Sequence, residues 1–336
     1  MNWILKIIEI ILIIIPILLS MAFLTLKERK VLANIQRRSG PNIVGIYGIL
    51  QPFSDAIKLF LKETVIPSHA NKIIYLITPI ITLSLALISW SVIPFNNNII
   101  IGDINLGLLY LLGISSLSVY GVLGSGWGSN SKYAFLGGLR STAQMISYEV
   151  SMGLLLLSVL IWTGSYNLSV IVITQEEGWN LIGLLPTSIL FLISILAETN
   201  RSPFDLPEGE SELVSGFNVE YSSMTFALFF LGEYVHIILM SIIFTIIFLG
   251  GWTNVITDKY WNIIGLEDLD LGWLKSFNMS IKTSLIIYWF IWVRGSYPRF
   301  RYDQLMGLVW KNILPLSIGL IMWNGSIIIA TNSLNW

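Results

Sequence analysis

The segment IIYLITPIITLSLALISWSVI, residues 73–93, decides the class of fold. It carries no charged side chain, and it is as long as the ~20 residues that an α-helix needs to cross the hydrocarbon core of a bilayer. The runs 10–19 and 241–249 are equally apolar. The whole chain of 336 residues is 54% hydrophobic and 12% charged, whereas about a quarter of a soluble domain is charged. The sequence therefore predicts an all-α integral membrane protein.

Apolar windows indicate about eight transmembrane helices in one domain, 1–336. The windows lie near 3–25, 73–94, 104–123, 142–163, 184–199, 223–250, 280–294 and 310–330. The fifth and seventh windows are short, so seven or nine spans remain alternatives. The first window lacks the short apolar core and small-residue cleavage site of a signal peptide, and we expect it to be a retained span.

One connection contains a further predicted helix, residues 51–66. Its apolar residues recur at helical spacing, and Asp55, Lys58 and Lys62 fall on the opposite face. Pro52 suits a first helical turn. This pattern predicts an amphipathic helix that lies on the membrane surface, docks on a partner subunit, or does both.

The placement of lysine and arginine predicts the orientation. Most of the 19 basic residues fall in the connections that follow the odd-numbered spans, and these connections would lie on one side of the membrane. Lys6, Lys259, Lys275 and Lys282 are assigned to the other side. We therefore expect the long basic loops to face the cytoplasm or the mitochondrial matrix, with both termini opposite.

Composition excludes several kinds of chemistry. A net charge of −1 gives no reason to expect a nucleic-acid partner. The absence of cysteine excludes thiolate-bound iron–sulfur clusters and cysteine zinc sites in this chain. His69 and His236 lie on separate segments, which favours a loop histidine and a bundle histidine over a haem pair. We expect no metal site, and we expect the chain not to carry electrons itself.

Several acidic residues lie at predicted membrane positions, where charged side chains are unusual. Glu149, Glu198 and Glu233 fall within or at the end of predicted spans, where ionisable groups are costly and usually functional. The connection 197–221 then adds further acids against Arg201 alone. Its additional members include Asp205, Glu208, Glu210 and Glu212. Carboxylates this close titrate as a coupled set and can exchange protons, although a solvated acidic loop is the alternative.

Two basic connections form a second group. Residues 27–42 read KERKVLANIQRRSGPN, and residues 292–306 read WVRGSYPRFRYDQLM. Each places arginines beside apolar or aromatic residues at a predicted membrane edge, and each contains a proline that restricts the backbone. Such a pocket would suit an amphiphile with a polar head. The alternative is that these arginines only anchor the topology.

At these residues the chain resembles the family of quinone-chamber membrane subunits of respiratory complex I, NADH:ubiquinone oxidoreductase chain 1. The resemblance is carried by collinear segments over most of the chain, at residues 28–30, 37–42, 48–63, 126–150, 197–222 and 292–306. Residues 32–35 and 295–296 depart from the pattern that we expect for the family. The resemblance implies eight spans and a place at the junction between the membrane arm and the redox arm.

The resemblance also implies roles for individual residues. The quinone-chamber set comprises Glu28, Arg29, Arg38, Phe230, Arg294 and Arg299. The proton-path set comprises Glu149, Glu198, Asp205, Glu208, Glu210, Glu212 and Glu233. Ubiquinone would be the substrate, while NADH, FMN and iron–sulfur clusters would belong to partner subunits of the redox arm.

The implied location is the mitochondrial inner membrane, or alternatively a bacterial plasma membrane, with membrane lipids and neighbouring membrane-arm subunits as further partners. Two other functions stay open at this point. One is a membrane subunit of a related hydrogenase, and the other is a stand-alone secondary transporter. The absence of a visible internal repeat gives the transporter no support.

Overall fold

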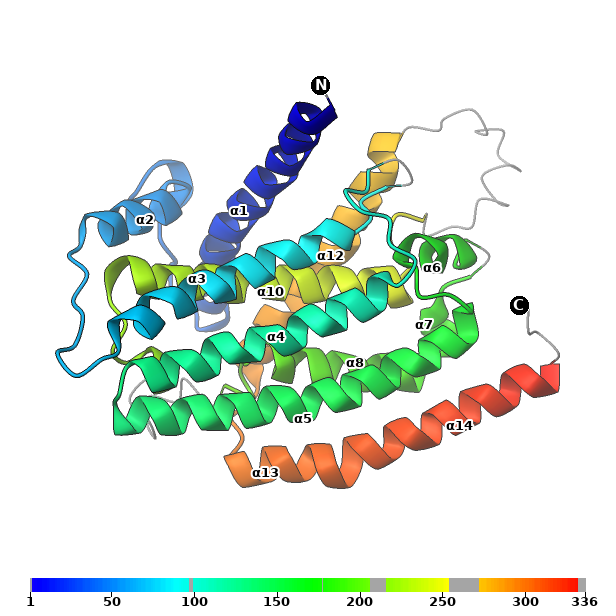
Figure 1. Ribbon diagram of the computed structural model, residues 1–336. Helices are drawn as coiled ribbons and strands as arrows, with labels where there is room; N and C mark the ends of the chain where they lie inside the picture. Colours follow the sequence, from blue (N-terminus) through cyan, green and yellow to red (C-terminus); the bar gives the residue numbers. More distant parts are fainter. Residues whose placement is uncertain (1, 97–98, 177, 206–215, 254–271, 332–336) are drawn as a thin grey trace.

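The computed structural model describes residues 2–96, 99–176, 178–205, 216–253 and 272–331 (Figure 1). In these residues the regular structure is helical, apart from one isolated β-bridge between Asn96 and Ile99. The predicted all-α class is therefore confirmed. Within these described ranges, six helices are long and apolar enough to cross a membrane.

The helices appear in chain order as follows. They are α1 (Asn2–Ile35), η1 (Ile46–Gly48), α2 (Gln51–Leu61), α3 (Lys72–Ile88), η2 (Ser89–Val92), α4 (Gly107–Gly128), α5 (Lys132–Thr163), α6 (Leu168–Thr174), α7 (Asn180–Gly183), α8 (Leu185–Glu198), η3 (Gly216–Asn218), α10 (Ser223–Phe248), α12 (Gly272–Ser296), α13 (Tyr302–Gly307), η4 (Leu308–Ile313) and α14 (Leu314–Thr331).

Each predicted apolar window overlaps a helix, but several helices are longer than their windows. Helix α1 continues to Ile35, and α5 begins at Lys132. Hydropathy windows stop where charged residues begin, whereas backbone hydrogen bonding continues past the membrane edge. Helices α13, η4 and α14 are consecutive, and η4 is a π-helical stretch. Pro315 accounts for it, because its ring displaces the carbonyl one turn earlier.

Helix α10 forms the centre of the bundle. From Val235 to Phe248 nearly all its side chains are buried. It packs against α3 on one side and against α1 and α12 on another, while α4, α5 and α14 continue the bundle outward (Figure 1). Helices α4 and α5 approach closely at Gly126, where an added Cβ would lie 2.8 Å from the carbonyl oxygen of Ala134. Small residues allow this kind of close packing in membranes.

Helix α2 is shorter than predicted, because residues 62–66 are not helical. The hydroxyl of Ser223 donates to the carbonyl oxygens of Leu59 at 3.1 Å and Lys62 at 2.5 Å. Lys62 adopts an extended conformation, so the helix stops there. At its other end, Asp55 pairs with Arg29 at 2.7 Å, which ties α2 to α1.

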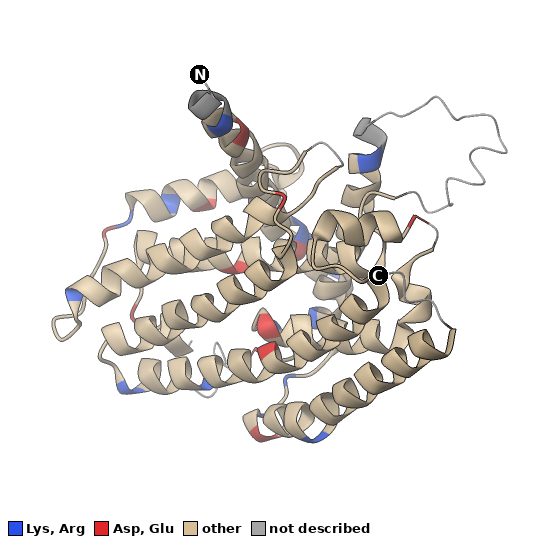
Figure 2. Cartoon of the chain, turned by 45° about the vertical axis from the view of Figure 1, so that its right-hand side comes forward, with Lys and Arg blue, Asp and Glu red and all other residues tan. Residues whose placement is uncertain are grey.

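The apolar face of α2 remains exposed, with 68% of Phe60 and 81% of Leu61 accessible. This exposure fits the predicted role of α2 as a helix that meets lipid or a partner subunit. Figure 2 shows that most charged residues fall at helix ends and in connections, while a few acidic and basic residues fall inside the helical bundle. The latter define the candidate site.

Candidate functional site

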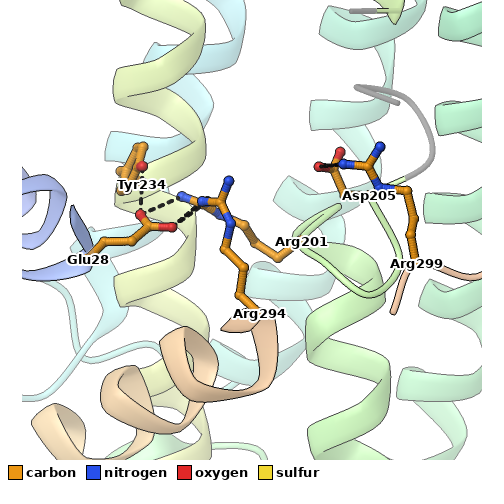
Figure 3. A network of polar contacts seen from close by, with 6 residues as sticks. All are labelled: Glu28, Arg201, Asp205, Tyr234, Arg294 and Arg299. Atoms are coloured by element: carbon orange, nitrogen blue, oxygen red, sulfur yellow. Dashed lines mark hydrogen bonds and ion pairs between the residues drawn. The ribbon is translucent and has the colours of Figure 1, made fainter. Parts of the chain in front are cut away.

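A buried charged cluster joins four segments that are distant in sequence (Figure 3). Glu28 of α1 pairs with Arg201, which follows α8, at 3.0 Å, and it also pairs with Arg294 of α12. Tyr234 of α10 donates its hydroxyl proton to Oε2 of Glu28 at 2.7 Å. Glu28 is only 5% exposed. The segment after α8 is therefore tied to three membrane helices by one carboxylate.

Arg201 keeps its charge in this buried position. Burial by itself lowers the pKa of the guanidinium, but the Glu28 carboxylate, the Tyr234 side chain and Glu233 offset it and raise the pKa above its ordinary value. The guanidinium also lies over the ring of Tyr234, 4.5 Å from the centroid. Arg201 is thus a permanent cation that interacts with two acidic residues, Glu28 and Glu233.

A small cavity lies against this cluster. Its volume is about 20 Å³, and apolar residues such as Leu24, Ile237 and Phe290 line it together with Glu28 and Arg294. A volume of this size accommodates about one water molecule. The cluster therefore combines charge, a phenol and an apolar wall at the place where α1, α10 and α12 meet.

An aromatic row on α10 leads to the cluster. The rings of Phe226 and Phe230 lie 4.5 Å apart, and those of Phe230 and Tyr234 lie 6.4 Å apart. The three residues are spaced four apart, so they share one face of the helix. Phe230, which the resemblance implied as a chamber residue, therefore lies beside the tyrosine that donates to Glu28.

The segment that carries Arg201 is anchored from α5. Nε2 of Gln144 donates to the carbonyl oxygens of Ala197 at 2.9 Å and Phe204 at 3.0 Å. The next residue, Asp205, pairs with Arg299 at 3.4 Å. The resemblance had assigned Asp205 to the proton-path set and Arg299 to the quinone-chamber set. The structure brings the two sets into contact at this pair.

A larger cavity of about 100 Å³ lies between α3, α4, α5, α8 and α10. Its lining is mostly apolar, but Glu198, Glu233 and His236 contribute to it. Glu198 is 1% exposed, and neither of its carboxylate oxygens has a hydrogen-bond partner among the described residues. Because buried polar atoms are nearly always hydrogen-bonded, such a carboxyl group needs a functional or solvent-based explanation.

Glu149 extends this acidic group. It interacts electrostatically with Glu198, and it lies beside Ser115 of α4, whose side chain also lines the larger cavity. Arg201 interacts electrostatically with Glu233. The cavity is therefore connected through Arg201 to the Glu28 cluster.

Like Arg299, two other predicted chamber residues lie outside the Glu28 cluster. Arg29 is half exposed and pairs with Asp55. Arg38 is exposed, and its Nε donates to Oε1 of Gln36 at 2.8 Å. The predicted proton-path residues Glu208, Glu210 and Glu212 lie outside the described residues.

Sequence reasoning missed three residues that organise the site, which are Arg201, Tyr234 and Gln144. Arg201 had a signal, because it is the one basic residue in an acidic connection. Tyr234 and Gln144 had none, since a tyrosine and a glutamine in apolar helices are common structural residues. Within the described part of the chain, no group of three histidine, aspartate or glutamate residues could hold a metal ion.

Comparisons with known proteins agree with one another. A family model described as NADH dehydrogenase matches residues 8–325. The chain is 55% identical to "NADH-ubiquinone oxidoreductase chain 1" of Chondrus crispus, over 97% of both chains. It is 53% identical to the protein of that name from Metridium senile, over 98% of this chain and 95% of the relative. It is 50% identical to an NADH-quinone oxidoreductase subunit of Paramagnetospirillum magneticum, over 96% of this chain and 92% of the relative.

Proposed function

The chain belongs to the NADH dehydrogenase family and is a multi-pass membrane subunit of an NADH:quinone oxidoreductase, and from this premise we propose that it forms the membrane-side part of a quinone chamber and a carboxylate route for protons. The names of the relatives give no support to a hydrogenase subunit or a stand-alone transporter. The observation that carries the proposal is the Glu28 cluster, because it combines headgroup-binding chemistry with a link to buried acids.

The quinone side of the proposal uses the cluster and the aromatic row. A quinone headgroup is planar and apolar with two carbonyl oxygens that accept hydrogen bonds. The Arg294 guanidinium has N–H donors beyond the one that it gives to Glu28, and Phe226 and Phe230 provide aromatic surface next to Tyr234. Binding sites for such ligands are mostly apolar with a few placed polar groups. Arg29, Arg38 and Arg299 would act at the outer parts of the chamber.

The proton side of the proposal uses the larger cavity. Reduction of a quinone to a quinol consumes two electrons and two protons, so negative charge develops in the chamber until protons arrive. Arg201 pairs with Glu28 and also interacts electrostatically with Glu233. A change of charge at Glu28 therefore alters the electrostatic potential at Glu233, and buried charges respond strongly because screening is weak.

Electrons enter from partner subunits in this proposal. The chain has no cysteine to hold an iron–sulfur cluster, so the NADH, flavin and cluster sites would belong to the redox arm. The mitochondrial inner membrane is the proposed location, with the long basic loops facing the matrix. Glu208, Glu210 and Glu212 keep their proposed place on the proton route, and this assignment rests on their sequence positions.

The quinone proposal is tested with Phe230→Leu and Arg294→Gln in the assembled complex. We expect both changes to raise KM for ubiquinone analogues, because each removes part of the headgroup site. Oxidation of NADH with a water-soluble electron acceptor should stay at the wild-type rate, since that reaction does not need the chamber. Trp323→Leu is a matched control, because Trp323 is 65% exposed on α14. Unchanged KM values in both test variants would remove these residues from the chamber.

A further inference from the structure

The larger cavity contains one titratable residue that the proposed proton route does not use. The Nε2 atom of His236 on α10 is buried, and it has no hydrogen-bond partner among the described residues. The imidazole lines the cavity together with Glu198 and Glu233. Glu233 and His236 are three residues apart, so they project from neighbouring positions on one face of α10.

Few titratable residues line the cavity beside His236, and those that do are acidic. Among the described residues that line the cavity, the other titratable groups are Glu198 from α8 and Glu233 from α10. Helices α3, α4 and α5 contribute no titratable group to the lining, and α3 and α4 add hydroxyls such as Thr82, Ser115 and Ser118. Beyond the lining, Glu149 interacts with Glu198, and Arg201 interacts with Glu233.

We propose that His236 is a proton-carrying residue of this cavity, which accepts and releases a proton between Glu198 on α8 and Glu233 on α10. The inference rests on the proposed proton route and adds a member to it. An imidazole is suited to this task because it binds a proton at one ring nitrogen and can release one from the other. A cavity of about 100 Å³ also leaves room for water to bridge the three side chains.

The proposed proton transfer has two steps, and each step conserves protons and charge. In the first, the protonated Glu198 carboxyl gives up its proton and neutral His236 takes it, so a carboxylate and an imidazolium form. In the second, the imidazolium gives a proton to the Glu233 carboxylate and returns to the neutral state. No other bond changes, and the net result is one proton moved from α8 to α10. The same steps operate in reverse when the charge in the chamber changes sign.

The test compares His236→Gln with His236→Leu in the assembled complex. Glutamine keeps a polar group that can bind water but cannot carry a proton. Leucine occupies part of the same space and has no polar side-chain atom. We expect both variants to slow coupled NADH:ubiquinone activity about tenfold or more, since positioned proton-transfer groups contribute ~10²–10⁴-fold. We also expect the pH profile of the residual activity to change shape, because one ionisation is lost.

The chain offers its own control, since His69 is its second histidine and lies exposed in the connection before α3. His69→Gln should behave as wild type, and NADH oxidation with a water-soluble acceptor should be unchanged in every variant. Wild-type rate and pH profile in His236→Gln would overturn the inference, because a water-holding side chain would then suffice. Should Glu198→Gln also retain wild-type coupled activity, the proton route itself would fail, which is a different outcome.

Discussion

Oε1 of Glu28 lies 3.0 Å from Nη1 of Arg201, and this buried pair joins the first helix to the segment after α8. Replacing Glu28 with glutamine would remove the carboxylate that Arg201 and Arg294 share. Removing one partner of a buried ion pair costs about 3–5 kcal/mol. We therefore expect Glu28→Gln to shorten the half-life of NADH:ubiquinone activity when the purified complex is heated.

The neighbouring residue supplies the control for this prediction. Arg29→Ala breaks an ion pair with Asp55 in which both side chains are more than a third exposed. Exposed pairs contribute about 0.2–1 kcal/mol, so this variant should keep nearly the wild-type half-life. Equal half-lives for Glu28→Gln and Arg29→Ala would contradict the prediction that the buried cluster stabilises the protein more than the exposed pair does.

Gln144 is predicted to position the segment that carries Arg201 and Asp205. Gln144→Leu removes the two hydrogen bonds to Ala197 and Phe204, and each contributes about 0.5–1.5 kcal/mol. Since the freed segment would hold Arg201 less firmly, we expect KM for ubiquinone to rise more than kcat falls. Met322→Leu, at a position on α14 that is 73% exposed, should change neither value. A Gln144→Leu complex with wild-type KM would refute the positioning role.

Lys282 is predicted to stabilise the bundle far from the site. Its Nζ donates to the carbonyl oxygens of Leu249 at 2.7 Å, Gly251 at 3.2 Å and Thr253 at 2.7 Å, just after α10 ends. Hydrogen bonds to charged groups contribute about 1.5–3 kcal/mol each, so Lys282→Met should lower thermal stability. Because this end of α10 lies about 20 Å along the helix from Tyr234, KM for ubiquinone should not change.

An exposed lysine gives the comparison for that measurement. Lys72→Met removes an exposed charge at the start of α3 and should leave thermal stability unchanged. If the two methionine variants denature at the same temperature as wild type, the carbonyl contacts of Lys282 contribute nothing measurable.

The predicted orientation can be tested cleanly, because the chain contains no cysteine. Lys58→Cys on α2 and Gly178→Cys before α7 place single thiols at exposed positions, and an added Cβ at Gly178 meets no atom within 4 Å. We expect a membrane-impermeant maleimide to label Lys58→Cys only from the matrix or cytoplasmic side, and Gly178→Cys only from the other side. The reverse pattern would invert the topology, and labelling of both variants from one side would change the number of spans between them.

The sequence predicted the fold class well because long apolar runs have few alternatives in a membrane. It predicted helix ends less well, since α1 and α5 continue past the last apolar residue and α2 ends early where Ser223 contacts its last carbonyls. Hydropathy contains no information about such contacts between residues distant in sequence.

Some residues of the candidate site were predicted from the sequence, but their arrangement was not. Glu28 and Arg294 were identified from the family resemblance, and the structure adds that they pair. The contact between Glu28 and Arg201 spans 173 positions of the chain, and no local pattern predicts it. Tyr234 could not be identified for the same reason, because its role depends on which helices α10 faces.

In the proposed function, buried carboxylates in the larger cavity couple quinone reduction to proton movement. The most direct measurement is the number of protons translocated per NADH oxidised in sealed membrane vesicles, with Glu198→Gln compared with wild type. We predict that Glu198→Gln assembles, since the side chain keeps its size, and that the ratio or the coupled rate falls sharply while NADH oxidation by a water-soluble acceptor is retained. A wild-type ratio at a wild-type rate would contradict this coupling role of the carboxylates.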